Sequence, residues 1–235
     1  TFDDGPSPGI TPGVLDTLAR YGATATFFVV GQYVAARPDL VQRAIAGGNS
    51  VQLHTMSHAE LTKLSAAQLA AEVDPEIDLL TSVTGRRPTC LRPPYGAWNS
   101  SVVNEVARRG IETIIWNVNP GDTEAGSNSS SIAARALAGA RPGAVIAMHD
   151  SATKGATLAA LPAIIEGIRA RGLTPVPLCQ AVAAPLIRDV AVRSDGRSGY
   201  AMDINGALHP FGGAPEATGV SSLPSPPPFM LADRM

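Results

Sequence analysis

The sequence predicts an α/β protein in which parallel strands alternate with helices, arranged as an incomplete (β/α) barrel or as an open sheet. Three observations carry this prediction. β-prone runs recur along the chain, and most are followed by a segment with apolar residues at helical spacing. Gly and Pro separate the two kinds of segment. We count about six or seven strands, short of the eight of a full barrel, and the first is truncated at Thr1.

The strands are expected where β-branched and aromatic residues cluster between turn signals. They fall at residues 1–4, 23–30, 50–53, 89–91, 112–116, 144–148 and 174–176. The helices are expected over residues 12–21, 32–46, 65–84, 99–109, 131–138 and 157–171.

Several residues predict how these helices begin and break. Thr11 is typical of an N-cap, with Pro12 at the first helical position. Asn99 or Ser100 is expected to cap the helix that follows it. We expect a break near Pro38, and at Asp74-Pro75 either a kink or two separate helices, because proline lacks the amide donor of a helix interior.

The composition changes after about Ala184. Asp195-Gly196 and Asn205-Gly206 are hairpin-turn dipeptides, so residues 185–216 are expected to form a small, irregular β-containing segment. Residues 217–235 contain a run of prolines and are expected to be a linker or tail. Residues 1–184 are then expected to form the main domain, in which any catalytic site is sought.

Charge and hydropathy exclude some partners. The 235 residues carry a net charge of −2, which gives no electrostatic case for nucleic acid or an anionic membrane surface. No apolar run is long enough to predict membrane insertion. The chain opens inside a strand-like segment without Met, so we interpret it as a fragment that leaves room for a leader peptide upstream.

The two cysteines, Cys90 and Cys179, are too few for a disulfide framework. They are interpreted either as two buried thiols or as one bridge. Of the two alternatives, the thiols are preferred.

Four clusters of polar residues follow four expected strands. Asp3-Asp4 ends the first strand, where Gly5-Pro6 stops it. Neighbouring strand residues point to opposite faces, so the two carboxylates are expected to have different tasks. The alternative is an Asp-Asp-Gly turn on the surface.

His54-Thr55-Met56-Ser57-His58 follows the strand at 50–53. On a helical turn, residues four apart share one face, so both imidazoles would lie near enough to share a metal. With Asp4 they would make a two-His, one-carboxylate site with positions open to water and substrate. The alternative is a pair of structural histidines.

His149-Asp150 and Arg92-Pro93-Pro94-Tyr95 also follow strands. A His there suits a general acid, because its pKa lies near neutrality, and the alternative is a helix-capping Asp150 beside an incidental His149. Two prolines would hold a loop rigid enough to aim an Arg and a backbone N–H. A fold that gathers strand ends on one face would bring all four clusters together.

In this order, these residues resemble the polysaccharide deacetylases of carbohydrate esterase family 4, also called the NodB homology domain. The resemblance covers residues 1–180 or so and five motifs, namely Thr1–Pro6, His54–His58, Arg92–Tyr95, the region Trp116–Thr123, and Ile146–Asp150. It implies a distorted (β/α)7 barrel of the NodB type, with its first strand truncated here.

The resemblance also implies a role for each residue. Asp4, His54 and His58 would hold a divalent metal, usually Zn²⁺, with Co²⁺ or Ni²⁺ as alternatives. Asp3 would take a proton from the attacking water, oriented and kept ionised by Arg92. The Tyr95 backbone N–H would stabilise the oxyanion, and His149 would protonate the departing amine. Substrate contacts would come from Pro93, Tyr95 and Met148.

The fourth motif departs from the family pattern Asp-x-x-Asp-Trp. Asn119 stands in place of an acidic residue expected to support the Arg92 side of the site, and Thr123 in place of a Trp expected to wall the sugar groove. These changes concern the tuning of Asp3 and the stacking of sugars. They leave the metal ligands and proton-transfer residues in place.

The resemblance implies a secreted or cell-wall-associated N-deacetylase, expected to be a monomer, that releases acetate from a GlcNAc-containing polymer such as peptidoglycan or chitin. One alternative is an acetylxylan or other O-acetyl esterase with the same machinery. Another is a wall-glycan-binding protein with an impaired site. The segment Val190–Pro215 resembles one unit of a repeat appended to actinobacterial secreted proteins, for which wall binding is a guess.

Overall fold

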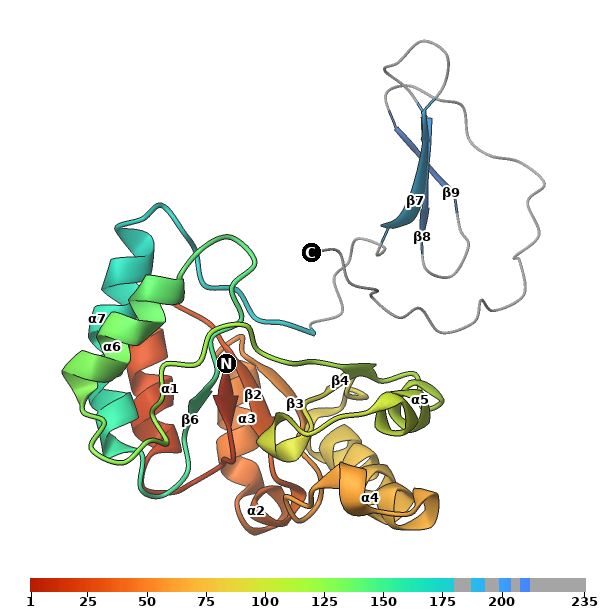
Figure 1. Cartoon of the computed structure of the whole chain (residues 1–235), viewed down its shortest axis with the longest axis horizontal. Coiled ribbons are helices and arrows are strands. Elements are labelled where there is room, and N and C mark those ends of the chain that lie inside the picture. The colour runs from red at the N-terminus through yellow and green to blue at the C-terminus, as the bar shows by residue number, and fades with distance from the viewer. Residues whose placement is uncertain (180–186, 193–198, 204–207, 212–235) are drawn as a thin grey trace. The chain divides into compact units, whose positions relative to one another are not determined.

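The computed structural model describes residues 1–179, 187–192, 199–203 and 208–211. The chain divides into two compact units, Thr1–Gln180 and Ala181–Met235. The first is an α/β unit and contains every residue predicted for the site (Figure 1).

A parallel sheet forms the centre of the first unit. Its strands are β1 (Phe2–Asp3), β2 (Thr26–Val29), β3 (Ser50–Leu53), β4 (Cys90–Leu91), β5 (Glu112–Thr113) and β6 (Met148–His149). They lie in the order β5-β4-β3-β2-β1-β6, so β1 is flanked by β2 and β6. All pairings are parallel, as the alternation of strands and helices predicts.

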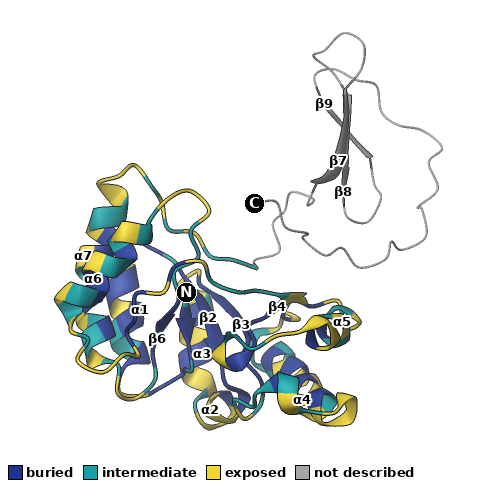
Figure 2. Cartoon of the chain, in the orientation of Figure 1, coloured by how far each residue is buried: buried dark blue, intermediate teal, exposed yellow. Residues whose placement is uncertain are grey.

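Seven helices accompany this sheet in the described part of the chain. They are α1 (Thr11–Arg20), α2 (Gly31–Ala36), α3 (Pro38–Ala46), α4 (Ala66–Thr84), α5 (Ser100–Ala107), α6 (Ser129–Gly139) and α7 (Gly155–Arg169). Contacts join neighbouring helices in the spatial order α6, α7, α1, α3, α4 and α5. These helices form an arc around the sheet (Figure 1). Figure 2 shows their buried residues in dark blue, and the hydrophobic core includes apolar residues from each of the helices α1 to α7.

The alternation of side chains divides the sheet into an apolar face and a polar one. Phe2 is in register with Phe27 and Val51, and all three belong to the hydrophobic core. Asp3 is in register with Phe28 and Gln52, which lie outside that core cluster although they are buried. Successive side chains of a strand point to opposite faces, so Asp3 and its neighbours in register share one face. Residues at the carboxyl ends of the strands can therefore meet one another on that face.

Among the described residues the six parallel strands form an open sheet with helices around it, which confirms the predicted α/β class and takes the open-sheet alternative to a barrel. The strand expected at 174–176 does not form. This segment contains Pro175, which cannot donate to a ladder, and it crosses the sheet instead: the Leu178 N–H donates to Thr26 Oγ1 at 2.6 Å.

At Pro75 the structure excludes one of the two predicted alternatives, and at Thr11 the predicted cap is wrong. Residues 66–84 form one helix, with Pro75 inside it, rather than two. Thr11 is the first residue of α1 and not its N-cap, which is Ile10. The Thr11 hydroxyl is used elsewhere: it accepts from the Ser7 N–H at 2.7 Å and donates to Asp150.

Other boundaries are confirmed. Arg37 separates α2 from α3 just before Pro38. Asn99 caps α5, its Oδ1 accepting from the Val102 N–H at 3.0 Å. Such a side-chain acceptor satisfies an amide that the helix itself leaves unpaired.

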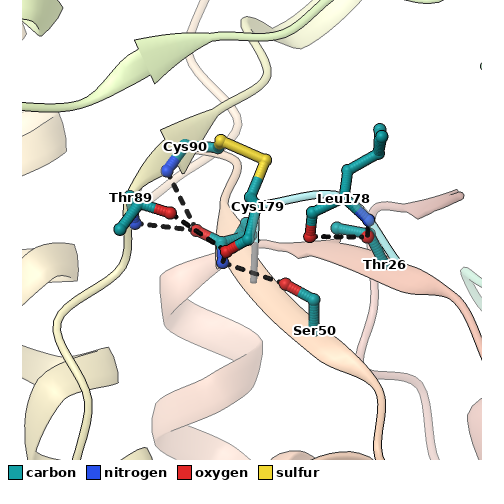
Figure 3. Close-up of a disulfide and its surroundings, with 7 residues drawn as sticks. Thr26, Ser50, Thr89, Cys90, Leu178 and Cys179 are labelled. Atoms are coloured by element: carbon teal, nitrogen blue, oxygen red, sulfur yellow. Dashed lines mark hydrogen bonds between the residues drawn. A yellow bond between two sulfur atoms is a disulfide. The ribbon is translucent and has the colours of Figure 1, made fainter. Parts of the chain in front are cut away.

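Cys90 and Cys179 form a disulfide, so the preference for two thiols is wrong (Figure 3). The bridge joins β4 to the segment that follows α7, across 89 positions of sequence. The Cys179 carbonyl accepts from Gln52 Nε2 at 2.9 Å and from Thr89 Oγ1 at 3.0 Å. The cysteines are brought together by this crossing segment, which no local sequence pattern announces.

The second unit contains a three-stranded antiparallel sheet of β7 (Ile187–Val192), β8 (Gly199–Asp203) and β9 (Leu208–Phe211), in that order. This confirms a β element after the α/β unit. The hairpin dipeptides Asp195-Gly196 and Asn205-Gly206 and the Pro-rich tail lie outside the described residues. Within the described residues, no helix is both long and apolar enough to cross a membrane.

Candidate active site and metal centre

Three predicted metal ligands converge at the carboxyl ends of β1 and β3. Asp4 Oδ1 lies 3.3 Å from His54 Nε2 and 3.1 Å from His58 Nε2. One ligand atom from each residue lies within 4.8 Å of the other two. Burial raises the pKa of Asp4, but hydrogen bonds from His54 and His58 outweigh it and hold that pKa below its usual range. The carboxylate is therefore ionised and can bind a cation.

The second nitrogen of each imidazole has a partner of its own. His54 Nδ1 lies 2.6 Å from the Arg92 backbone oxygen, and His58 Nδ1 lies 3.3 Å from the Tyr95 hydroxyl. A carbonyl can only accept, so His54 Nδ1 carries a hydrogen. Its Nε2 donates to Asp4 when the ring is protonated and has a lone pair for a metal when the ring is neutral. A metal-binding His commonly has such a partner. These three residues therefore fit a divalent metal.

The segment from His54 to His58, here called the His loop, is not the helical turn expected from its spacing. Thr55 and His58 have φ values of 69° and 63° in the left-handed region. Asp4 also has a positive φ, 72°. Left-handed backbone is strained for residues other than Gly, and such strain gathers at functional sites.

Asp3 and Asp4 have different partners, as strand alternation predicts. Asp3 is buried and its Oδ1 accepts from Arg92 Nη1 at 2.7 Å. The Arg92 guanidinium is fully buried, stacks over the Phe28 ring at 4.1 Å and also donates to the Thr1 hydroxyl. This packing fixes the position of the Asp3 carboxylate.

His149 belongs to a buried polar cluster that includes a residue the sequence analysis did not assign. Its Nδ1 lies 2.9 Å from Asp122 Oδ1, and its backbone N–H donates to Asp122 Oδ2 at 2.8 Å. The Thr157 hydroxyl also donates to Asp122 Oδ2. Burial lowers the pKa of His149, but the Asp122 carboxylate outweighs it, so that pKa is raised. Asp122 could have been found as the second Asp of the fourth motif.

Asp150 is neither a helix cap nor an exposed residue. It is completely buried, its N–H donates to the Asp3 carbonyl, and its Oδ2 accepts from Thr11 Oγ1 at 2.5 Å. Burial raises the pKa of Asp150 to about 7. The residue therefore ties the end of β6 to β1 and α1.

The remaining predicted residues lie at different depths. Tyr95 is 68% exposed, and its ring meets that of His58 edge-on with centroids 4.7 Å apart. Pro93 is buried beside it. Met148 is buried in the hydrophobic core, where it lines an apolar cavity of about 260 Å³ with Phe2 and Leu161. The structure thus brings Tyr95 to the metal ligands but not the Met148 side chain.

The altered fourth motif does not disturb the ion pair between Arg92 and Asp3. Asn119 is exposed, and its side chain accepts from the Gly121 N–H at 2.8 Å, which closes a local turn. Thr123 is also exposed. The Arg92–Asp3 pair forms without either residue.

Comparison with known proteins agrees with this geometry. A family model described as polysaccharide deacetylase matches residues 1–114. The chitooligosaccharide deacetylase of Bradyrhizobium sp. is 36% identical over 199 residues, which cover 77% of this chain and 88% of that protein. The chain belongs to the polysaccharide deacetylase family. The resemblance to carbohydrate esterase family 4 is confirmed.

Two further members of the family show how much of each protein is shared. The peptidoglycan-N-acetylglucosamine deacetylase PgdA of Listeria monocytogenes is 42% identical over 150 residues. This matched region covers 64% of this polysaccharide deacetylase chain and 31% of PgdA. A family 4 carbohydrate esterase from Streptomyces lividans, solved in complex with acetate, is 33% identical. It covers 74% of this chain and 88% of its own, with a TM-score of 0.69.

Proposed function

We propose that this chain is a metal-dependent N-deacetylase that releases acetate from a GlcNAc-containing polysaccharide of the peptidoglycan or chitin type. The observation that carries the proposal is the convergence of Asp4, His54 and His58 within 4.8 Å, beside the separate Asp3–Arg92 and Asp122–His149 pairs. The class of polymer is supported by the relatives that act on chitooligosaccharide and peptidoglycan.

Asp4, His54 and His58 would hold the metal. Two imidazoles and one carboxylate suit Zn²⁺, and Co²⁺ or Ni²⁺ also accept such ligands. When bound, a divalent cation lowers the pKa of water and polarises a carbonyl group.

The chain's own residues then divide the proton transfers. Asp3, oriented by Arg92, takes a proton as the water oxygen bonds to the acetamide carbon. The Tyr95 backbone N–H would donate to the oxyanion formed on that carbon. His149 donates its proton to the nitrogen as the carbon–nitrogen bond breaks. The products are acetate and a free amino sugar.

The exposure of Tyr95, Pro93 and Met148 decides which of them can contact the substrate. The Tyr95 ring is exposed next to His58, so it is suited to contact the sugar that carries the acetyl group. Pro93 and Met148 are buried and would act on the substrate only by shaping the backbone next to Arg92 and His149.

The proposal is tested by measuring acetate release from a chitin oligomer with Zn²⁺ added and then removed by a chelator. Wild type is compared with Asp3→Ala, and Zn²⁺ binding is measured for both. We expect metal-dependent release by wild type, and for Asp3→Ala bound Zn²⁺ with almost no release. No release from folded, Zn²⁺-loaded wild type on chitin, peptidoglycan or acetylated xylan would reject the enzyme and favour a glycan-binding protein.

An O-acetyl esterase is the second candidate. The similarity to a carbohydrate esterase from Streptomyces lividans favours it, since the same residues would cleave an ester. An alkoxide leaving group needs less help from a proton donor than an amine does. The two activities are therefore distinguished by their dependence on His149.

The disulfide supports export. Disulfides persist in oxidising environments and are rare in reducing ones, so the Cys90–Cys179 bridge fits a secreted or wall-associated protein. We further propose that residues 1–184 form the catalytic domain, 185–216 a small β segment and 217–235 a linker or tail.

A further inference from the structure

The His loop carries two of the three proposed metal ligands but has no regular structure of its own. Thr55 and His58 are in the left-handed region, at φ values of 69° and 63°. Strained backbone persists only where surrounding contacts determine it. The position of the ligands must therefore be set by what the loop packs against.

Three backbone N–H groups of the His loop, those of His54, Met56 and Ser57, donate to one helix, α4. Glu76 Oε1 accepts from the His54 N–H at 3.0 Å, a donor shared with the Val29 carbonyl. The Met56 N–H donates to the Glu72 carbonyl at 2.9 Å, and the Ser57 N–H to the Glu72 carboxylate at 2.8 Å.

The sequence of α4 explains why a helix can offer these acceptors. Glu72 and Glu76 are four apart and so lie on one face. Pro75 lies between them, and a proline inside a helix removes one helical hydrogen bond and displaces carbonyls of the preceding turn. The carbonyl that loses its helical donor is that of Ala71, and the neighbouring Glu72 carbonyl accepts from the Met56 N–H.

The carbonyl groups of the loop are held from the other side by α2. The Gly31 N–H donates to the Thr55 oxygen at 3.0 Å, and the Gln32 N–H to the Met56 oxygen at 2.9 Å. A Cβ at Gly31 would lie 2.3 Å from the Met56 sulfur and 3.3 Å from the Glu76 side chain. The loop is thus clamped between α2 and α4 with no room to shift.

Glu76 is an unusual choice for packing alone. It is completely buried, and its Oε2 has no partner in the part of the chain that the structure describes. Burying such an oxygen is unfavourable, so an apolar side chain would serve the core better. What Glu76 adds is an acceptor for the amide of His54, at the start of the His loop.

We propose that Glu76, together with Glu72, is a positioning residue that presets His54 and His58 for the metal. This inference rests on the proposed metal centre. It predicts that the acceptor oxygen at position 76 controls metal affinity, and not merely the stability of the fold.

The test measures the Zn²⁺ dissociation constant of the folded apoprotein by competition with a chromophoric chelator, for wild type, Glu76→Gln and Glu76→Leu. Glutamine keeps the acceptor oxygen, so its affinity should stay within roughly threefold of wild type. Leucine removes it and should weaken binding about 10–100-fold, the range seen when partners of metal ligands are lost. Leu80→Ala on the same helix is the control and should lower the melting temperature without changing affinity.

Equal affinity of Glu76→Leu and wild type would overturn the proposal, whatever the melting temperature. If Glu76→Leu does not fold, Glu72→Ala replaces it, because Glu72 is only partly buried and its loss should still weaken binding about tenfold. Unchanged affinity there would also overturn the proposal. Failure of wild type itself to bind Zn²⁺ through His54 would instead reject the metal centre, so the two failures are distinguishable.

Discussion

At the scale of single residues, two buried carboxylates of the candidate site are distinguished by their partners. Asp3 is paired with a buried guanidinium, and Asp122 with an imidazole. The Asp122 carboxylate raises the pKa of His149 above its ordinary value of 6.5 despite burial. The protonated form of His149 therefore stabilises the fold fully below pH 6.5, and this stability is lost as the pH rises through the raised pKa.

Asp122→Asn should change the dependence of kcat on pH, so that the fall in kcat on the alkaline side begins at a lower pH. Without the carboxylate, burial dominates and the pKa of His149 falls, so the acid is deprotonated earlier as pH rises. Activity should thus be lost more at pH 8 or so than at about pH 6. The profile is measured by acetate release, with the exposed Thr123→Ala as control. An unchanged dependence of kcat on pH would contradict the assignment of His149 as the acid.

His149→Ala should lower kcat on an N-acetylated oligomer by about 10²–10⁴-fold, the usual contribution of a general acid. The loss on an O-acetylated substrate should be much smaller, because its leaving group needs less protonation. Both rates are measured on one preparation of enzyme. Equal losses on the two substrates would argue against protonation of the leaving group.

At the scale of elements, helix ends follow local side-chain chemistry while helix interiors follow packing. Asn99 caps α5 as its position predicts. Pro75, by contrast, predicts a kink or two separate helices, and α4 continues through it as one helix. Leu69, Val73, Ile77 and Leu80 of this helix are all buried, and their packing outweighs the bond that the proline removes.

Asn99→Ala should lower the free energy of unfolding by about 1 kcal/mol, because the Val102 amide loses its acceptor. Asn99→Asp keeps a capping oxygen and should remain close to wild type. Urea denaturation of the three proteins measures the difference. If alanine were as stable as aspartate, the side chain would contribute no capping energy.

At the scale of the whole molecule, the disulfide fastens the segment after α7 to β4 across the sheet. The loop it closes spans 89 positions, so its loss releases much conformational freedom in the unfolded chain. The apolar face of the sheet and the arc of helices remain as the main core.

Removal of the bridge should destabilise the first unit by about 2–4 kcal/mol. The double variant Cys90→Ala/Cys179→Ala and reduced wild type are compared with oxidised wild type by thermal unfolding. Both should melt lower than the oxidised protein, and reductant should not affect the variant. If reduction, verified by thiol titration, left the melting temperature unchanged, the stabilising role would be disproved.

The sequence by itself determined the class of fold, the alternation of strands and helices along the chain, and the three residues that converge in the candidate metal site. Asp4, His54, His58, Arg92 and His149 each follow a strand, and strand ends are visible in local patterns of β-prone residues and turns. Parallel strands gather these ends at one edge, so the local pattern sufficed to place the residues together.

Only the tertiary structure decided the open sheet, the Cys90–Cys179 bridge and the contacts of Glu76 with the His loop. Each depends on residues far apart in the chain, and neither periodicity nor turn chemistry carries information about such pairs. The His loop shows the physical reason most clearly. Spacing suggested a helical turn, but hydrogen bonds from α2 and α4 hold the loop in a strained conformation that its own sequence would not favour.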